Sequence, residues 1–250
     1  MLCSTHPGVP GGEEQGQANS ALGDSPPLDV FPVTPRFVPP RVHRAPHCLP
    51  NPYAMTTIEA TAVPTRSQRL KSATSSTHDS LDKRIMSEDI FASRERFARF
   101  VRVQYRFHRE IQALYAAPVL DALLPDLAER QRLGQIADDL GDLQQTLPAE
   151  AAPAVPSDVD LAHALGWLYV AEGSNLGGTI LFKMAAKLGL GAQFGASHLA
   201  AHPDGAARHW RQFTAALDTV LLSDAQEAAV IDGANTAFRT VRGYVEEEFA

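Results

Sequence analysis

Three side chains at helical spacing could present a histidine to a metal ion and a cation to a carboxylate of the same ligand. His78 lies in a helical stretch in which Lys71 comes seven residues earlier and Asp82 four residues later. These intervals are two turns and one turn of an α-helix, so the three side chains share a face. Proteins commonly present histidine to a metal as an imidazole whose second nitrogen is held by a carboxylate. A polar histidine on the surface is the plainer explanation, and spacing alone leaves both open.

A second stretch, 167–183, carries Gly173, Gly177 and Gly178 in the middle of an otherwise helical pattern. Each interior glycine costs a helix about 1 kcal/mol relative to alanine. Either a bulky ligand lies against the bare backbone, or another helix packs closely there. The stretch follows no strand and lacks the G-x-G-x-x-G spacing, which argues against a dinucleotide loop.

The two stretches explain one another if the ligand is haem. His78 would bind the iron from one side, and the glycine-bearing helix would lie against the other. A face lined by glycine leaves room for iron-bound dioxygen, and Lys71 could pair with a haem carboxylate.

Other catalytic chemistries find little support in the sequence. There is no G-x-S-x-G motif, and the only cysteines, Cys3 and Cys48, lie near the N-terminus. No glutamate is followed three residues later by histidine, so the pattern of di-iron helical bundles is absent. His198 and His202 have a spacing that could suit zinc, but Pro203 and nearby glycines indicate a loop there.

Composition changes sharply near residue 64. Twelve of the 18 prolines fall at or before Pro64, so we expect residues 1–64 to be a disordered extension and residues 65–250 a single domain. Met55 is an alternative start of the chain.

The absence of cysteine from the domain fits a reducing compartment, here the cytoplasm. No run of 18 apolar residues exists, so we expect no membrane span.

Charge is unevenly distributed along the chain. The formal net charge is −7, yet residues 66–109 carry eleven basic and five acidic residues. The basic residues include a helical stripe of Arg99, Arg102, Arg106 and Arg109. Such a stripe indicates either a docking surface for an acidic partner or a solvated face. Nothing in the sequence indicates nucleic-acid binding.

Almost everything after Pro64 has helical character, which predicts an all-α bundle. The first helix is expected over 66–84, and a second, capped by Ser87, ends before Pro118. The second buries Phe97, Phe100, Phe107, Ile111 and Leu114, with the polar Gln104 in the same series. Shorter helices are expected over 119–132 and 135–146.

Capping signals delimit the remaining helices. Ser157 and Asp160 resemble a capping box before the glycine-bearing helix, which should end near Leu188 at Gly189 or Gly191. Another helix is expected over 210–222. Ser223 and Gln226 form a capping box for the last helix.

The sequence resembles the haem oxygenase family, in particular its soluble bacterial, biliverdin-producing branch. The resemblance covers residues 66–250. Its most specific parts are Leu-Lys-x-Ala-Thr-x-x-x-His at 70–78, Tyr-x-x-x-Gly-Ser-Asn-Leu-Gly-Gly at 169–178, and Ala-Asn-Thr-Ala-Phe at 234–238.

The resemblance implies a role for each matching residue. His78 is expected to be the proximal iron ligand, and Lys71 and Tyr169 to bind haem propionates. Gly173 and Gly177 are expected to contact the haem and to let the distal helix kink. The remaining implied contacts are Gly178, which extends that run, Lys183, which serves a propionate or the reductase, and Phe238, which walls the distal pocket.

Two positions depart from the family pattern. Ser174 stands where the mammalian branch has an aspartate that anchors the distal waters. Ser174, backbone carbonyls or another group must therefore hold the waters that deliver protons. Asp82 replaces the commoner glutamate after the proximal histidine, and its shorter arm calls for a bridging water.

The implied reaction is the oxidative cleavage of haem to biliverdin, CO and Fe(II), with O2 and electrons from a ferredoxin, flavodoxin or flavin reductase. The biliverdin would serve iron acquisition or supply a bacteriophytochrome with its chromophore. A haem carrier or sensor on the same fold is the alternative. A haem-free, thiaminase-like helical enzyme is a second rival, against which the lack of cysteine counts.

Overall fold

The computed structural model describes residues 63–149, 155 and 159–250. Over these residues the chain is helical and has no strand, which confirms the expected all-α class. The helices are α1 (Arg66–Met86), α2 (Arg94–Glu110), α3 (Gln112–Tyr115), α4 (Pro118–Asp121), η1 (Ala128–Arg130), α5 (Leu133–Asp142), α6 (Leu161–Ala185), η2 (Ala186–Leu188), η3 (Ser197–Leu199), α7 (Ala206–Thr219) and α8 (Asp224–Glu248). The expected extension 1–64 and the alternative start at Met55 lie almost wholly outside the described residues.

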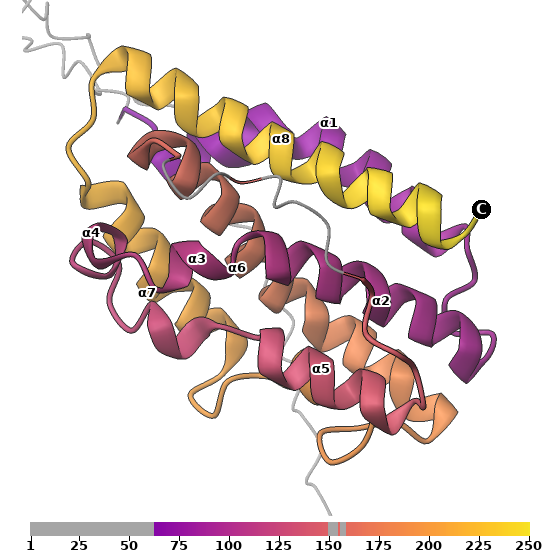
Figure 1. Ribbon diagram of the computed structural model, residues 1–250. Helices are drawn as coiled ribbons and strands as arrows, with labels where there is room; N and C mark the ends of the chain where they lie inside the picture. Colours follow the sequence, from indigo (N-terminus) through magenta and orange to yellow (C-terminus); the bar gives the residue numbers. More distant parts are fainter. Residues whose placement is uncertain (1–62, 150–154, 156–158) are drawn as a thin grey trace, which may run out of the picture. The chain divides into compact units, whose positions relative to one another are not determined.

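Two long helices, α6 and α8, form the centre of the bundle. α8 packs against α6, α1 and α2, and α2 lies between α8 and α5 (Figure 1). The predicted apolar series is buried as expected, from Phe97 on α2 to Leu114 on α3, although the helix is interrupted at Ile111. The two ends of that series enter different core clusters, so α2 joins the part of the core near α5 to the larger part around α6 and α8.

The end of α1 corrects one predicted helix start. Ser87 is the C-cap of α1, and its hydroxyl donates to the carbonyl of Arg84. Asp89 then takes a left-handed conformation with φ 47°, which breaks the helical path. The second helix instead begins after Ser93, whose hydroxyl accepts a hydrogen bond from the Arg96 amide.

The helix expected over 119–132 is wrong. Only the four-residue α4 and the single turn η1 form there. Pro125 lacks an amide donor and disfavours helical geometry at Leu124 before it, and Asp126 has φ 59°. The next helix, α5, ends at Asp142 rather than 146, and Gln144 beyond it has φ 57°.

Capping explains where α6 and α8 begin and end. Asp160 caps α6 by accepting from the Ala162 and His163 amides, whereas Ser157 lies outside the described residues. After one 3-10 turn, Gly189 ends the helix with φ 71°, as predicted. The Ser223–Gln226 capping box of α8 is confirmed. α7 starts four residues earlier than expected and ends three residues earlier.

Candidate functional site

Close helix packing uses a glycine, but not one of the three central glycines of α6. A Cβ on Gly166 would lie 2.2 Å from the Val230 carbonyl oxygen of α8. A Cβ on Gly177 would meet nothing within 4 Å. On Gly173 and Gly178 it would make only ordinary contacts, at 3.6 Å from Trp210 and 3.5 Å from Leu199. Packing within the described protein therefore explains Gly166 and leaves the central glycines without a structural requirement.

The surface around these glycines is open and apolar. Leu176 and Ile180 are 37% and 66% exposed, whereas the N-terminal half of the same helix is largely buried. Gly177 between them is also exposed. An apolar, side-chain-poor surface of this kind suits a flat, largely apolar ligand such as haem.

His78 lies on α1 with its side chain about half exposed, at 54%. Its Nδ1 is 3.4 Å from Asp82 Oδ2 and 3.8 Å from Asp79 Oδ1. Phe238 of α8 meets the imidazole edge-on, with ring centroids 5.7 Å apart. Asp82 therefore lies beside Nδ1 and Phe238 beside the ring, and the predicted hydrogen bond to Asp82 stays a prediction.

The two predicted propionate contacts differ in their surroundings. Lys71 is exposed on α1 and has no ion-pair partner among the described residues. Tyr169 is buried on α6 and packs against Trp210, with ring centroids 5.4 Å apart. Burial, and secondly the charge of Asp218, raise the pKa of Tyr169, so its phenol stays protonated and can donate to a carboxylate.

Lys183 and Phe238 lie at different parts of the bundle. Lys183 is exposed near the C-terminal end of α6, fourteen residues and about 21 Å of helix beyond Tyr169. Phe238 is buried in the core cluster that includes Tyr169. Phe238 also contacts the ring of His78, and its place in the wall of a distal pocket stays a prediction.

A cavity of about 40 Å³, lined by both polar and apolar side chains, lies beside the glycine segment. Ser174 and Gly178 line it from α6, and Gln104 lines it from α2. The Ser174 hydroxyl donates to the Ala171 carbonyl of its own helix, at 2.7 Å. Toward water it can therefore act only as a hydrogen-bond acceptor. A cavity of this size holds about three waters.

Three buried side-chain atoms that line this cavity have no hydrogen-bond partner among the described residues: His108 Nδ1, Asn175 Nδ2 and His198 Nε2. Buried polar atoms are nearly always satisfied by protein or by ordered water. Ordered water is the partner that would satisfy these three atoms, and sequence reasoning missed all of them. Only Gln104, a polar residue in an apolar helical series, hinted at this cavity.

The electrostatics of the cavity are set by buried groups. Burial lowers the pKa of His108 to about 3, helped by the nearby His198 and Arg132, so its imidazole is neutral at ordinary pH. His198 Nδ1 lies 2.6 Å from Asp139 Oδ2. Although burial raises the pKa of Asp139, hydrogen bonds from His198 and Ser197 lower it overall, so the carboxylate stays ionised.

The comparison with protein families identifies the family of this chain. Residues 65–247 match the family model described as Heme oxygenase. This chain belongs to the haem oxygenase family. The open glycine segment and all the described helices, except the last residue of α8, fall within the matched range.

Individual haem oxygenases resemble the chain over nearly their whole length. "Heme oxygenase PigA" of Pseudomonas aeruginosa is 42% identical over 192 residues, which is 77% of this chain and 97% of that protein. The crystal structure of a Neisseria meningitidis haem oxygenase bound to NO and CO has 38% identity and a TM-score of 0.70, covering 75% of this chain and 93% of that one. The Leptospira interrogans haem oxygenase, at 18% identity and a TM-score of 0.62, shares the fold over 74% of this chain and 100% of its own.

The arginine stripe on α2 has internal partners in this haem oxygenase. Arg102 Nε lies 2.7 Å from Glu248, and Arg106 pairs with Glu247 at 2.5 Å and Glu248 at 3.3 Å. Arg99 donates to the Glu248 carbonyl, and Arg109 donates to the Pro148 and Ala149 carbonyls. The stripe therefore fixes the end of α8 and the segment that follows α5, which leaves less of it to dock a partner.

No described helix combines the length and the apolar character needed to cross a bilayer.

Proposed function

We propose that this protein is a haem oxygenase that binds haem between α1 and the glycine segment of α6, and cleaves it to biliverdin, CO and Fe(II). The observation that carries the placement is the open space at Gly177, flanked by the exposed Leu176 and Ile180. A Cβ at Gly177 would intrude on a ligand and on nothing else in the described protein.

His78 supplies the iron ligand in this proposal. Asp82, 3.4 Å from Nδ1, holds the imidazole so that Nε2 is the nitrogen left for iron. A carboxylate on the other imidazole nitrogen also strengthens the ligand as an electron donor. Phe238 limits rotation of the ring by its edge-on contact.

Lys71 and Tyr169 are proposed to seat the propionates. Both lie toward the N-terminal ends of their helices, while Lys183 lies far along α6. Haem anchored by Lys71 and Tyr169 would present a different edge to the glycine segment than haem anchored by Lys183. The choice between these anchors would therefore set which meso carbon is attacked.

Haem supplies the iron, the oxygen chemistry and the carbon that is oxidised, while the protein supplies binding, orientation and protons. Gly173 and Gly177 keep side chains away from the oxygen-binding face. Waters in the adjacent cavity, held by His108, Asn175 and His198, would bring protons to that face. Ser174 contributes an acceptor to the same waters, which replaces the aspartate of the mammalian branch.

Electrons are proposed to come from a ferredoxin, flavodoxin or flavin reductase. Lys183 is exposed and has no ion-pair partner among the described residues, so it is available to an acidic partner. Lys183→Glu should raise the KM for the physiological donor and leave haem affinity unchanged if this surface docks it. An unchanged KM for each of the three donor classes would contradict this docking role.

The cytoplasm is the proposed location, and a bacteriophytochrome is a proposed acceptor of the biliverdin. Cell fractionation tests the first. Covalent attachment of the product to an added bacteriophytochrome apoprotein, followed by its red absorption band, tests the second.

Single-turnover spectroscopy of the haem complex tests the proposed function. With ascorbate or a reductase and O2, the wild-type complex should lose its Soret band and yield biliverdin. His78→Ala should change the haem spectrum and abolish turnover, whereas His163→Ala should do neither. His163 is a matched control because it too is a partly exposed helical histidine beside carboxylates, Asp160 and Asp232. A haem complex that persists under electron supply would indicate a carrier or sensor instead.

A further inference from the structure

Glu172 immediately precedes Gly173, yet its carboxylate is turned into the protein and is 2% exposed. Both oxygens are engaged. Tyr115 of α3 donates its hydroxyl to Oε1 at 2.9 Å, and Arg130 of η1 donates Nη1 to Oε2 at 3.0 Å. Glu172 is therefore held from two directions by elements that are separate in sequence.

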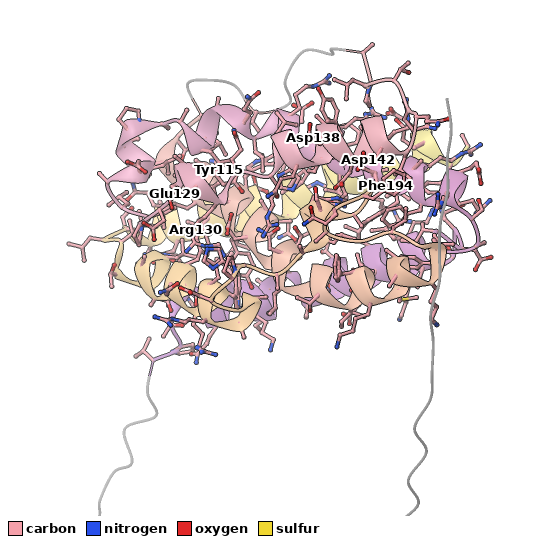
Figure 2. The ribbon with its side chains drawn as sticks, turned by 90° about the horizontal axis from the view of Figure 1, so that it is seen from below. Tyr115, Glu129, Arg130, Asp138, Asp142 and Phe194 are labelled. Atoms are coloured by element: carbon pink, nitrogen blue, oxygen red, sulfur yellow. The ribbon has the colours of Figure 1, made fainter. Side chains whose placement is uncertain are left out.

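Arg130 is itself fixed to the surrounding backbone. Its side chain is 1% exposed, Nε donates to the Pro125 carbonyl at 3.3 Å, and the guanidinium reaches the His209 carbonyl of α7 at 3.5 Å. It also lies over the Phe213 ring, 5.6 Å from the centroid. In Figure 2, Tyr115 and Arg130 lie near one another at the same end of the bundle, whereas Asp138 and Phe194 lie toward the other. The cluster of Glu172, Tyr115 and Arg130, which we call the Glu172 clamp, thus joins α3, η1 and α7 to α6.

The clamp lies at the boundary between a well-anchored and a poorly anchored part of α6. The side chains of residues 168–172 are buried. From Gly173 to Gly177 the helix has no buried residue, and Gly178, which is buried, has no side chain. Successive residues of a helix are 100° apart, so fixing Glu172 also fixes the direction in which Gly173 faces.

A buried ion pair is a poor choice if stability alone is needed, because well-packed apolar residues in its place are often as stabilising or more so. Such a pair does define one geometry, since two oxygens and two donors must meet at fixed distances. Burial raises the pKa of Tyr115 well above its ordinary range, which keeps the phenol a hydrogen-bond donor.

We propose that Glu172 is a positioning residue, which, with Tyr115 and Arg130, fixes the rotation of α6 and so the position of Gly173 and Gly177 against the haem. The inference rests on the proposed placement of haem at these glycines. If the clamp is broken, the glycine segment should become more mobile, and this effect is expected in the haem-free protein as well.

Two variants break the clamp in different ways. Tyr115→Phe removes one hydroxyl and retains the ring. The double variant Glu172→Leu with Arg130→Met replaces the ion pair by apolar groups of similar size, which keeps the fold while removing the directional bonds. Glu110→Gln is the matched control, because Glu110 is a buried carboxylate that accepts from the Tyr244 hydroxyl at 2.8 Å, on α2 rather than α6.

The first measurement is hydrogen exchange of the α6 amides in the haem-free protein. Both clamp variants should exchange at least about tenfold faster than wild type over 173–178, and Glu110→Gln should not, because local opening governs exchange there. Wild-type exchange over 173–178 in both variants would overturn the proposal. Because no haem is present, this outcome is separate from any failure of the proposed haem placement.

The second measurement uses the haem complex. We expect a changed ratio of high-spin to low-spin ferric haem, a changed distribution of biliverdin isomers, and a fall in turnover of about ten- to a hundredfold, since misplacement by about 1 Å has effects of that size. The haem Kd should change by less than about threefold. If the double variant folds and reproduces the wild-type spin ratio, isomer distribution and turnover, the clamp does not position the glycines. If it does not fold, Tyr115→Phe alone decides between the same outcomes.

Discussion

Gly177→Ala should stabilise the haem-free protein and weaken its haem complex. The added Cβ meets nothing within 4 Å, so it brings no steric strain to the described protein. Replacing an interior helical glycine by alanine gains up to about 1 kcal/mol of helix stability. For a domain of this size, that corresponds to a rise in Tm of about 2–4 °C. The same methyl group would occupy space needed by the haem, and displacement costing about 1.4 kcal/mol would raise the haem Kd about tenfold.

Gly166→Ala should have the opposite effect on stability. Its Cβ would lie 2.2 Å from the Val230 carbonyl oxygen and 2.6 Å from the Ala234 amide nitrogen, and both atoms belong to backbone that cannot rotate away. Overpacking ordinarily costs about 1–3 kcal/mol, and this overlap belongs at the upper end. After the gain in helix propensity, we expect a net loss of about 2 kcal/mol.

Urea unfolding of the haem-free protein and haem titration by absorption measure the two effects separately. Gly141→Ala on α5 is the control, because a Cβ there also meets nothing within 4 Å. It should gain stability without altering the haem Kd. Two results would refute the proposed contact between Gly177 and the haem. One is that Gly177→Ala destabilises the haem-free protein, and the other is that it stabilises that protein and leaves the haem Kd at the wild-type value.

Three further predictions follow from individual side chains. Tyr169→Phe should raise the haem Kd about tenfold, the effect of losing a hydrogen bond to a carboxylate, whereas Tyr105→Phe should leave it unchanged in the same titration. The pKa of His108 is about 3 in the folded state and about 6.5 unfolded, so below pH 6.5 the unfolded chain takes up the proton and stability falls by up to about 1.4 kcal/mol per pH unit. His108→Gln should flatten this dependence between pH 6.5 and 3 in urea titrations, and an unchanged slope would place the titration elsewhere. Arg102→Met should lower the free energy of unfolding by about 1 kcal/mol by removing one of the two arginine partners of the Glu248 carboxylate, without changing the KM for the electron donor.

Local signals in the sequence predicted much of the fold. The Ser223–Gln226 box and Gly189 each act through one or two neighbouring backbone groups, so they can be read without knowing the tertiary structure. The start of α6 was placed less well, because Asp160 is itself the N-cap and not the partner of a cap at Ser157. The helix expected over 119–132 does not form because Pro125 and the left-handed Asp126 interrupt the helical path within it. Ser87 failed because its hydroxyl donates backward to α1 instead of capping the next helix.

The site was predicted less completely, because some of its features depend on contacts distant in sequence. His78 and Asp82 share one helix, so their spacing was sufficient to pair them. The unpartnered atoms of His108, Asn175 and His198 come from three separate helices, and only the assembled fold brings them to one cavity. The α2 arginines similarly find their acids more than 140 residues later, at the end of α8.

A crystal structure of the haem complex tests the central claim most directly, because that claim is where the haem lies. We predict iron bound by His78 Nε2, with the backbone of Gly173 and Gly177 against the opposite face of the macrocycle. An iron ligand other than His78, or haem bound away from these glycines, would contradict this account.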